Sequence, residues 1–556
     1  MRSTVFVISA VLLSTACSDN APSGGAAVAP STDVSAPVQD NTWQASGWSA
    51  KTLPELVAAL EAGEVSAEAL VEAYLARIDA VDRNGPTLQS VLSVNPDALE
   101  QARAVDASRA AGEPLGSLAG VPVLLKDNIE SADSLATTAG ALALKHNVTN
   151  RDAPLTAGLR REGAIILGKT NLSEWANFRS THSISGWSAL GGQVRNPHML
   201  DRSPCGSSSG SGAAVAASLA AAAVGTETNG SITCPANVNG IVGFKPTVGV
   251  ISQQYIVPIS ASQDTAGPMT KTVRGAAMLL EAMADEAHRK FYAAGLDAGS
   301  LVGRRVGVLR FSVGDNPDIA ARFSEAMTVL ADAGAELVEI GEFKRHSDNF
   351  WAQHLSLLQY EFKSGIDAYL VDAADAVTTR SLAALIEFND AHADVEQALF
   401  DQDLFTASQA KAGLDSTDYL ASRDAVQRTA REFGIDALLA EHNVEVLVAP
   451  SGPVSSRIDP VNGDVWPDWA GAGYLAAAAG YPHLTVPMGA VHGIPIGLSF
   501  MGAANDDAAI LSYGYAYEQA SQRRVEPQYL RTAEDLPEIA DAMRAPAQGS
   551  LPRITR

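Results

Sequence analysis

The chain has 556 residues, of which 46% are hydrophobic and 18% are charged, and this composition is ordinary for a globular protein with a large core. Its formal net charge is −24. Proteins that bind nucleic acid or anionic lipid through charge need a surface rich in Lys and Arg. The charge therefore argues against a nucleic-acid partner and against electrostatic attachment to a membrane.

The first 17 residues, MRSTVFVISAVLLSTAC, have the pattern of an export signal, with one Arg, an apolar run over residues 5–13 and small residues before Cys17. The run is too short for a transmembrane helix, which needs about 20 apolar residues. Cys17 resembles a bacterial lipoprotein site, at which the cysteine is lipidated after cleavage. Ser14 stands where such sites usually have leucine, so ordinary cleavage after Ala16 stays open. Either route predicts an exported protein, periplasmic or held at the cell envelope only through a lipid on Cys17.

Residues 18–42 are rich in Pro, Gly, Ser and Ala and lack periodicity, which predicts a flexible linker. We expect one folded domain over residues 43–545 and a short tail over 546–556. The sequence TLPE at residues 52–55 has the spacing of a helix capping box, and residues 66–83 have a helical apolar face. Two helices are therefore predicted at the start of the domain.

Two short apolar strands follow, and each leads into a lysine. Residues 120–128 read GVPVLLKDN, so that Lys126 ends a buried strand. Residues 164–167 form the second strand, and Lys169 comes in the turn after it. We favour a structural role for Lys169, and a buried, functional role for Lys126.

Residues 203–235 contain two loops of small residues, GSSSGSG and TETNGSI, on either side of an alanine-rich run over residues 213–223. The run lacks Gly and Pro, which predicts a buried helix. The loops are too rich in Gly and Ser to be packed elements, and they let backbone N–H groups converge on a small anionic group. Gly/Ser clusters are often only linkers, but an apolar helix does not normally interrupt a linker.

The sequence GSSSG at residues 206–210 also matches the G-x-S-x-G nucleophile elbow of other hydrolases. That motif needs an acidic residue and a histidine further along the chain, and only His483 or His492 are candidates. Neither lies in a segment that resembles a triad loop, so this alternative ranks low.

The C-terminal half alternates strand, helix and strand over residues 301–342, which predicts an α/β unit, and further short strands cover 444–450 and 484–487. Residues 344–441 are helical, acidic and rich in aromatic residues. We expect this helical region to cap the mouth of the active site and to help select the substrate, although any single aromatic residue there is more often part of the core. The S-x-x-K sequence at 408–411 lacks the partner motifs of penicillin-recognising enzymes and is treated as chance.

Three separated motifs, in this order, resemble the amidase signature family: the strand that ends in Lys126, the first Gly/Ser loop and the second one. Residues 493–499, GIPIGLS, also resemble a C-terminal strand of that family. The resemblance implies an α/β fold with a single large mixed β-sheet surrounded by helices. It also implies that Ser231 is the nucleophile, that Ser207 follows a cis peptide bond and relays protons, and that Lys126 is the base.

The chemistry of these residues is consistent with that assignment. A serine hydroxyl needs a base to become nucleophilic. No histidine is placed to serve Ser231, and His182 is assigned to the surroundings of the pocket. Lys126 can serve if burial lowers its pKa from about 10.4 toward 7–8.

The remaining site residues are expected to bind the oxyanion or the substrate. The backbone N–H groups of Thr228, Asn229, Gly230 and Ser231 can bind an oxyanion, and Ser208 and Asp127 complete the expected set. The sequence has no metal-binding cluster such as H-E-x-x-H, and we expect no metal and no cofactor.

Departures from the commoner family pattern point to a subfamily. The second loop reads ETNGSIT where D-x-G-G-S-I-R is usual, and Cys205 replaces a glycine of the first loop. This combination most resembles bacterial peptide amidases, which release ammonia from C-terminally amidated peptides. Cys205 and Cys234 each border a catalytic loop, and a disulfide and an unlinked buried pair are equally compatible with the sequence.

Three alternatives remain. The substrate can instead be an aryl or alkyl amide, a carbamate or a short polyamide oligomer. The chain can be an amidase subunit that transfers ammonia to charged tRNA, against which the export signal and the acidic charge both count. It can also be a catalytically silent relative that only binds peptides.

Overall fold

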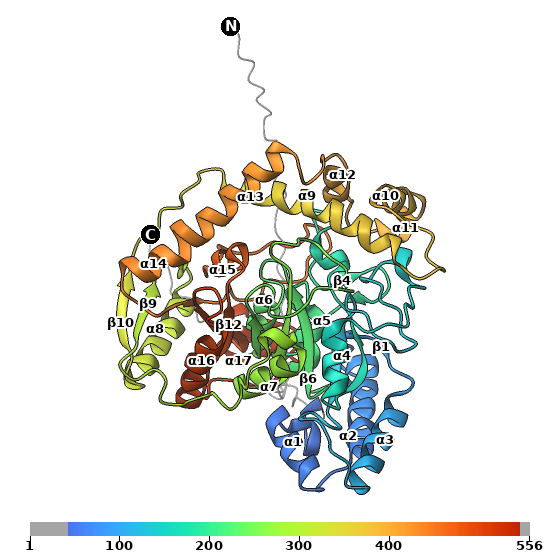
Figure 1. Cartoon of the computed structure of the whole chain (residues 1–556). Coiled ribbons are helices and arrows are strands. Elements are labelled where there is room, and N and C mark those ends of the chain that lie inside the picture. Colours follow the sequence, from blue (N-terminus) through green and yellow to red (C-terminus); the bar gives the residue numbers. More distant parts are fainter. Residues whose placement is uncertain (1–42, 545–556) are drawn as a thin grey trace, which may run out of the picture. The chain divides into compact units, whose positions relative to one another are not determined.

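Eleven strands form one mixed sheet in the computed structural model, which describes residues 43–544 (Figure 1). The strand order is β1 (Val91–Val94), β3 (Ile165–Thr170), β2 (Pro122–Lys126), β6 (Ala222–Glu227), β8 (Thr265–Thr270), β7 (Val242–Lys245), β12 (His483–Val491), β13 (Ile494–Met501), β11 (Val446–Pro450), β9 (Arg305–Leu309) and β10 (Glu336–Ile340). Strands β4 (Trp187–Ser188) and β5 (Gly192–Gln193) form a small hairpin. The predictions for residues 1–42, including the lipid on Cys17, and for the tail lie outside the described residues.

Two parts of the sheet are parallel. Strand β2 pairs in parallel with both β3 and β6, and β9 pairs in parallel with β10 and β11. The remaining pairings are antiparallel. The predicted α/β unit over residues 301–342 is the parallel β9–β10 pair, connected by α8 (Pro317–Asp332).

Helices surround this sheet, as predicted. Those of the N-terminal half are α1 (Leu53–Glu61), α2 (Ala67–Arg77), α3 (Ala98–Ala110), α4 (Pro154–Arg161), α5 (Ser209–Ala216), α6 (Thr233–Asn239) and α7 (Val273–Met283). After α8 come α9 (Phe350–Val371), α10 (Leu382–Ala391), α11 (Ala393–Glu396), α12 (Asp403–Gln409), α13 (Thr417–Ala430), α14 (Asp436–Glu441), α15 (Gly473–Ala479), α16 (Asp507–Ser521) and α17 (Pro537–Met543). None of the helices in the described part of the chain is both long and apolar enough to cross a membrane.

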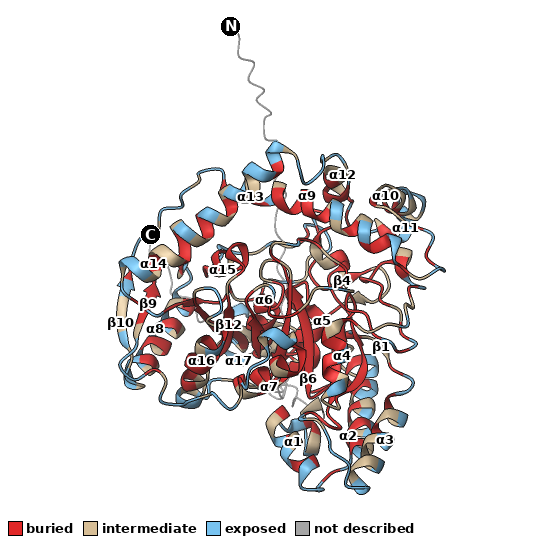
Figure 2. Ribbon diagram, viewed as in Figure 1, coloured by how far each residue is buried: buried red, intermediate tan, exposed pale blue. Residues whose placement is uncertain are grey.

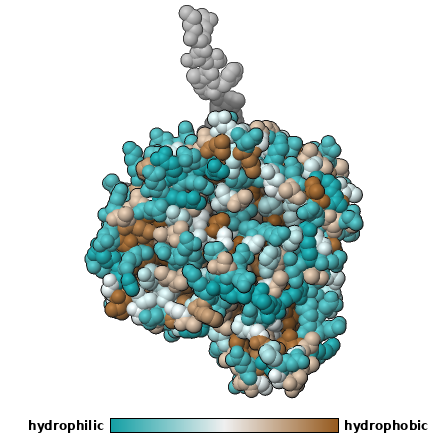
Figure 3. Space-filling model, viewed as in Figure 1, coloured by the Kyte–Doolittle hydropathy of each residue, from teal (hydrophilic) through white to brown (hydrophobic). Residues whose placement is uncertain are grey.

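The central strands are buried on both faces, as Figure 2 shows for β6 and β12. Every residue of β2, β3 and β6 is buried. Strands covered by helices on both faces read as continuous apolar runs rather than alternating ones, and VPVLL before Lys126 is such a run. On the face drawn in Figure 3, hydrophilic residues predominate and apolar residues form separate patches.

The first predicted helix is α1, which begins as expected. Thr52 precedes it, and the Glu55 carboxylate accepts a hydrogen bond from the Thr52 N–H group at 2.7 Å. The second predicted helix, over residues 66–83, is α2 followed by a π-helical segment, Ile78–Asn84.

The prediction of one helix over residues 213–223 is wrong at both ends. Helix α5 begins at Ser209, inside the Gly/Ser loop, and ends at Ala216, while Ala222 and Ala223 belong to β6. The loop is therefore packed and buried, not open. Small residues are required there because a Cβ at Gly210 would lie 2.3 Å from the Ser90 carbonyl oxygen and 2.4 Å from that of Asn171.

Candidate active site

Neighbouring parallel strands bring the predicted catalytic residues together. Lys126 is the last residue of β2, and β6, its parallel neighbour, ends at Glu227, so that Ser231 follows at the same edge of the sheet. Ser207 lies just before α5, and the Gly206–Ser207 peptide bond is cis, as the resemblance implied.

Lys126 is fully buried and contacts hydroxyl groups. Its Nζ donates to Ser207 Oγ at 2.7 Å, to Thr226 Oγ1 at 2.8 Å and to the Thr226 carbonyl at 3.3 Å. Burial lowers the pKa of Lys126 to about 7, although the negative charges of Asp264 and Glu227 act in the opposite direction. A large fraction of this lysine is therefore neutral near pH 7 and can accept a proton from Ser207.

The two serine loops are in direct contact. The Ser208 N–H donates to the Ser231 carbonyl at 3.1 Å. Ser207 has no exposed surface, whereas Ser231 is 9% exposed, so Ser231 is the serine that a substrate can reach. Among the described residues no hydrogen bond joins Ser207 Oγ to Ser231 Oγ.

The loop before Ser231 has the features of an oxyanion site. In the described structure, no hydrogen bond uses the N–H groups of Asn229, Gly230 or Ser231. Glu227 Oε2 accepts hydrogen bonds from the N–H groups of Ile232 at 2.8 Å and Thr233 at 3.0 Å. These bonds hold the end of the loop, directly after Ser231. Gly230 has φ +81°, a conformation that favours glycine.

A disulfide joins Cys205 to Cys234, with Cα atoms 5.9 Å apart. It connects the segment before Ser207 to α6, which follows Ser231. This resolves the alternative that the sequence left open. Cys205 has φ +54°, a backbone conformation that glycine adopts most easily. This conformation explains why a glycine is usual at this position of the motif.

A cavity of about 510 Å³ opens beside this disulfide, and Asn229 and Gly230 form part of its wall. Its aromatic lining consists of Trp351, Trp466, Trp469 and Tyr474. Polar groups in the wall include Arg345 and Asp464. The Asp464 carboxylate accepts from the N–H of Ser185, another lining residue, at 3.0 Å. We call this space the large cavity. Its size and mostly apolar wall suit a small organic ligand.

Thr228, Ser208 and Asp127, three of the residues predicted to bind the oxyanion or the substrate, do not line the large cavity. Ser208 Oγ donates to the Thr226 carbonyl and accepts from the Thr226 N–H, both at 3.1 Å. Asp127 is fully buried and accepts from the Thr138 hydroxyl and N–H, and burial raises its pKa to about 6. These contacts hold loops in place, and nothing in the geometry brings either side chain to the large cavity.

The histidines of the lower-ranking alternatives are also placed. His483 lines the large cavity but bonds to Ser499 Oγ at 2.6 Å, and exposed His492 lies near Asp318. Neither contacts Ser208, the centre of the GSSSG sequence, so the nucleophile-elbow alternative has no geometric support. Lys169 donates to the Ile129 carbonyl and to Thr137 Oγ1, in agreement with a structural role.

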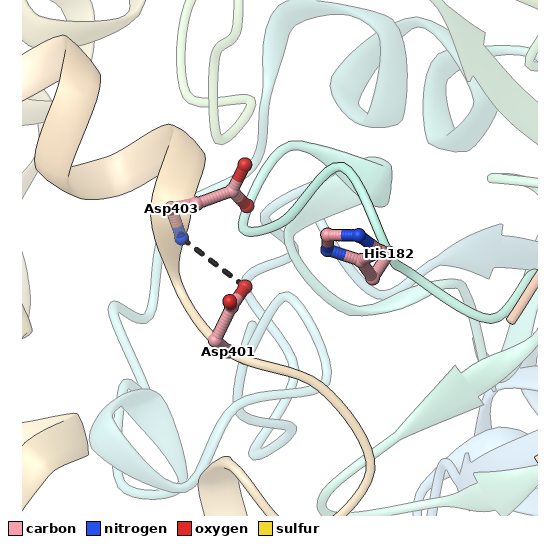
Figure 4. A group of neighbouring side chains, drawn as sticks. All are labelled: His182, Asp401 and Asp403. Carbon is pink, nitrogen blue, oxygen red and sulfur yellow. Dashed lines mark hydrogen bonds between the residues drawn. The ribbon is translucent and has the colours of Figure 1, made fainter. Parts of the chain in front are cut away.

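His182 belongs to the one group of potential metal ligands found in the described residues. Its imidazole lies near the carboxylates of Asp401 and Asp403 (Figure 4). Both carboxylates already accept hydrogen bonds, Asp401 from Ser180 Oγ at 2.6 Å and Asp403 from Thr181 Oγ1 at 2.7 Å. These bonds attach the start of α12 to the turn that carries His182.

Three residues of the site were not identified from the sequence. Thr226 contacts Lys126, Glu227 holds the oxyanion loop, and Asp264 accepts from Thr228 Oγ1 at 2.5 Å. Glu227 occupies the acidic position of the family loop, and this match could have indicated its role. Asp264 lies well after Ser231, directly before β8, in a segment without a recognised motif.

The family model for amidases matches residues 69–511. The chain belongs to the amidase signature family. A probable amidase of Arabidopsis thaliana is 35% identical over 497 residues, which cover 86% of this chain and 91% of the relative. This family membership makes the protein an enzyme that hydrolyses a carbon–nitrogen amide bond.

Solved structures agree with this assignment. The native peptide amidase of Stenotrophomonas maltophilia is 45% identical, with a TM-score of 0.81, over 86% of this amidase and 98% of that chain. An amidase family protein of Bacillus anthracis is 35% identical, with a TM-score of 0.77, over 86% and 92% of the two chains. The predicted fold, a large mixed sheet surrounded by helices, is therefore confirmed.

Proposed function

We propose that this amidase removes ammonia from C-terminally amidated peptides through an acyl-enzyme on Ser231. The observation that carries the catalytic part is the 2.7 Å hydrogen bond between the buried Lys126 Nζ and Ser207 Oγ, in a loop that contacts Ser231. The similarity to the peptide amidase of S. maltophilia supports the substrate. A further peptide amidase structure, 46% identical, holds the competitive inhibitor chymostatin.

The proposed first step forms the acyl-enzyme. Neutral Lys126 accepts the Ser207 proton while Ser207 accepts that of Ser231, and Ser231 Oγ attacks the amide carbonyl. The unbonded N–H groups of Asn229, Gly230 and Ser231 bind the oxyanion, and each such donor stabilises the transition state by about 3–4 kcal/mol. The proton on Lys126 returns through Ser207 to the leaving nitrogen, and ammonia departs.

Ammonia release from a panel of substrates tests this proposal. The panel contains an amidated dipeptide, a simple aliphatic amide and an aryl anilide, the last followed by its amine. We expect ammonia from the amidated dipeptide alone, and Ser231→Ala should lower the rate by about four orders of magnitude because no other group replaces the nucleophile. Ser451→Ala, at a serine that lines the large cavity, is the matched control and should stay within about tenfold of the wild type.

The other outcomes separate the alternatives. Turnover of the anilide or the aliphatic amide would keep the mechanism and discard the peptide substrate. No turnover of any substrate, with peptide binding equal in the wild type and Ser231→Ala, would identify a silent binding relative.

We also propose that the protein is exported and carries a lipid on Cys17. The Cys205–Cys234 disulfide supports export because such bonds persist in oxidising compartments. Labelling of cells with a radioactive fatty acid should mark the wild type and not Cys17→Ser. Recovery of unlabelled wild-type protein in the cytoplasmic fraction would contradict both parts.

A further inference from the structure

A second cavity lies apart from the large cavity, and Asp264, which accepts a hydrogen bond from Thr228 of the loop before Ser231, forms part of its wall. It has a volume of about 400 Å³, lies between residues 253–264 and α9, and shares no lining residue with the large cavity. We call it the side cavity. Its wall contains Gln253, Ile256 and Asp264 from the segment that follows β7, and Gly365 and Ala368 from α9.

A small chamber lies between the side cavity and the catalytic residues. Ser207, Thr226, Thr228 and Asn128 form part of its wall, and its remaining boundary includes Gln253, Ile256 and Asp264. These last three residues line both spaces. The chamber therefore adjoins the side cavity at these three residues, and it has no lining residue in common with the large cavity.

The chamber has the size and polarity of a site for one water molecule. The room available to water is about 10 Å³, which corresponds to a single bound molecule. Asn128 is 3% exposed, and its Oδ1 has no hydrogen-bond partner among the described residues, whereas its Nδ2 donates to Thr226 Oγ1 at 3.0 Å. A water in the chamber would have the Asn128 oxygen as acceptor and the hydroxyls of Ser207 and Thr226 as further partners.

We propose that the side cavity and the chamber form a route through which water enters to hydrolyse the acyl-enzyme, separate from the route of the substrate. This inference rests on the proposed acyl-enzyme mechanism. Asn229 and Gly230 of the proposed oxyanion site line the large cavity, so we place the acyl group of the acyl-enzyme there, and water from that side would have to pass it. Water in the chamber meets Ser207 directly, the residue that has to take its proton.

The deacylation step balances with the groups present. Water loses one proton to Ser207 Oγ as the Ser207 proton moves to neutral Lys126, and the water oxygen bonds to the acyl carbon. The bond between that carbon and Ser231 Oγ then breaks. Lys126 returns its proton through Ser207 to Ser231 Oγ, which leaves a free carboxylic acid and the regenerated enzyme.

Filling the junction between the side cavity and the chamber tests this route. Gln253 is half-buried, so Gln253→Trp adds bulk where the fold can accommodate it, and Ile256→Phe is a second filling variant. Two substrates with the same acyl group, a dipeptide amide and its methyl ester, separate the steps. Ammonia release in the first turnover of the amide measures acylation, and kcat for the ester measures deacylation because ester acylation is fast.

We expect Gln253→Trp and Ile256→Phe to lower ester kcat by about tenfold or more and to leave the first-turnover ammonia rate within about twofold of the wild type. Gln519→Trp, at an exposed glutamine of α16 that lines neither cavity, should change neither rate. Wild-type ester kcat in both filling variants would overturn the proposal. Equal loss of both rates would also overturn it, since only a general distortion acts on both steps. A wild type that releases no ammonia and hydrolyses no ester would instead refute the acyl-enzyme mechanism, and the water route with it.

Discussion

What distinguishes Lys126 from the other buried lysines is its contact with a hydroxyl in the loop that touches Ser231. Lys245 donates to the carbonyl of Pro246, and Lys271 donates to carbonyls of residues 49–51. A carbonyl can only accept a hydrogen bond, whereas a hydroxyl can pass a proton on. Lys169 also contacts a hydroxyl, that of Thr137. Lys126 contacts the hydroxyl of Ser207, whose loop touches Ser231, and this makes it the lysine suited to proton transfer.

The pKa of Lys126 predicts the pH dependence of the reaction. The base must be neutral, so kcat/KM should fall as the pH drops through about 7, where Lys126 becomes protonated. The negative charge of Asp264 raises the pKa of Lys126, and therefore Asp264→Asn should shift this acid limb to lower pH. A pH profile of kcat/KM for both proteins measures the shift.

Asp264→Glu is the control for this experiment because it keeps the charge. Its acid limb should stay near that of the wild type even if kcat changes through the bond to Thr228. An acid limb that moves to higher pH in Asp264→Asn would show that Lys126 is not the group that titrates.

At the scale of single elements, the sequence predicted strands better than loops. The apolar run before Lys126 belongs to β2, which ends at that residue as predicted, and β11 lies within the predicted strand over residues 444–450. The first Gly/Ser loop was predicted to be open, but its glycines allow close packing. A glycine is needed at position 210 because the carbonyl groups of Ser90 and Asn171 lie too close for a Cβ atom. These residues are distant in sequence, so no local pattern around Gly210 could have predicted the contacts.

Gly210→Ala should therefore destabilise the fold, although alanine is the better helix former. The added Cβ would meet the backbone oxygens of Ser90 and Asn171, so either those segments or α5, with the loop that carries Ser207, would have to shift. We expect a loss of about 1–3 kcal/mol in the free energy of unfolding, measured by denaturant titration. Gly341→Ala, where a Cβ would have no neighbour within 4 Å, is the control and should stay within about 0.5 kcal/mol. Equal stability of the two variants would contradict the packing argument.

The Cys205–Cys234 disulfide should contribute to stability through the chain that it closes. The two cysteines are 29 residues apart, and a loop of that length corresponds to about 3–4 kcal/mol in the chain-entropy model. In the double variant Cys205→Ser, Cys234→Ser the free energy of unfolding, measured by denaturant titration, should be lower by this amount. A reductant should lower the stability of the wild type and leave the double variant unchanged. A reductant effect of equal size on both proteins would disprove the assignment.

At the scale of the whole molecule, the lowered pKa values of buried lysines predict how the free energy of unfolding depends on pH. Burial lowers the pKa of Lys126 and Lys271 to about 7 and that of Lys245 to about 8. Between pH 7.5 and 9 the unfolded chain keeps these lysines protonated and therefore binds more protons than the folded protein. Stability should rise with pH in this window, by up to about 1.4 kcal/mol per pH unit for each lysine.

Unfolding free energies at pH 7.5, 8.2 and 9 measure this slope, and Lys245→Met should reduce it by removing one of the titrating groups. A slope that is flat in the wild type, or unchanged in Lys245→Met, would mean that these lysines are charged in the folded protein.

The strand order has a consequence for the continuity of the chain. Strands β1 to β8 of the main sheet occupy one side and β9 to β13 the other, and the two groups meet only where β7 pairs with β12. Lys126, Ser207 and Ser231 all belong to the first group, whereas Trp466, Trp469 and Tyr474 of the large cavity belong to the second. A cut between α7 and β9 would thus break no strand pairing. Two fragments divided there should assemble into an active enzyme when mixed, with the catalytic groups on one piece and the aromatic wall on the other.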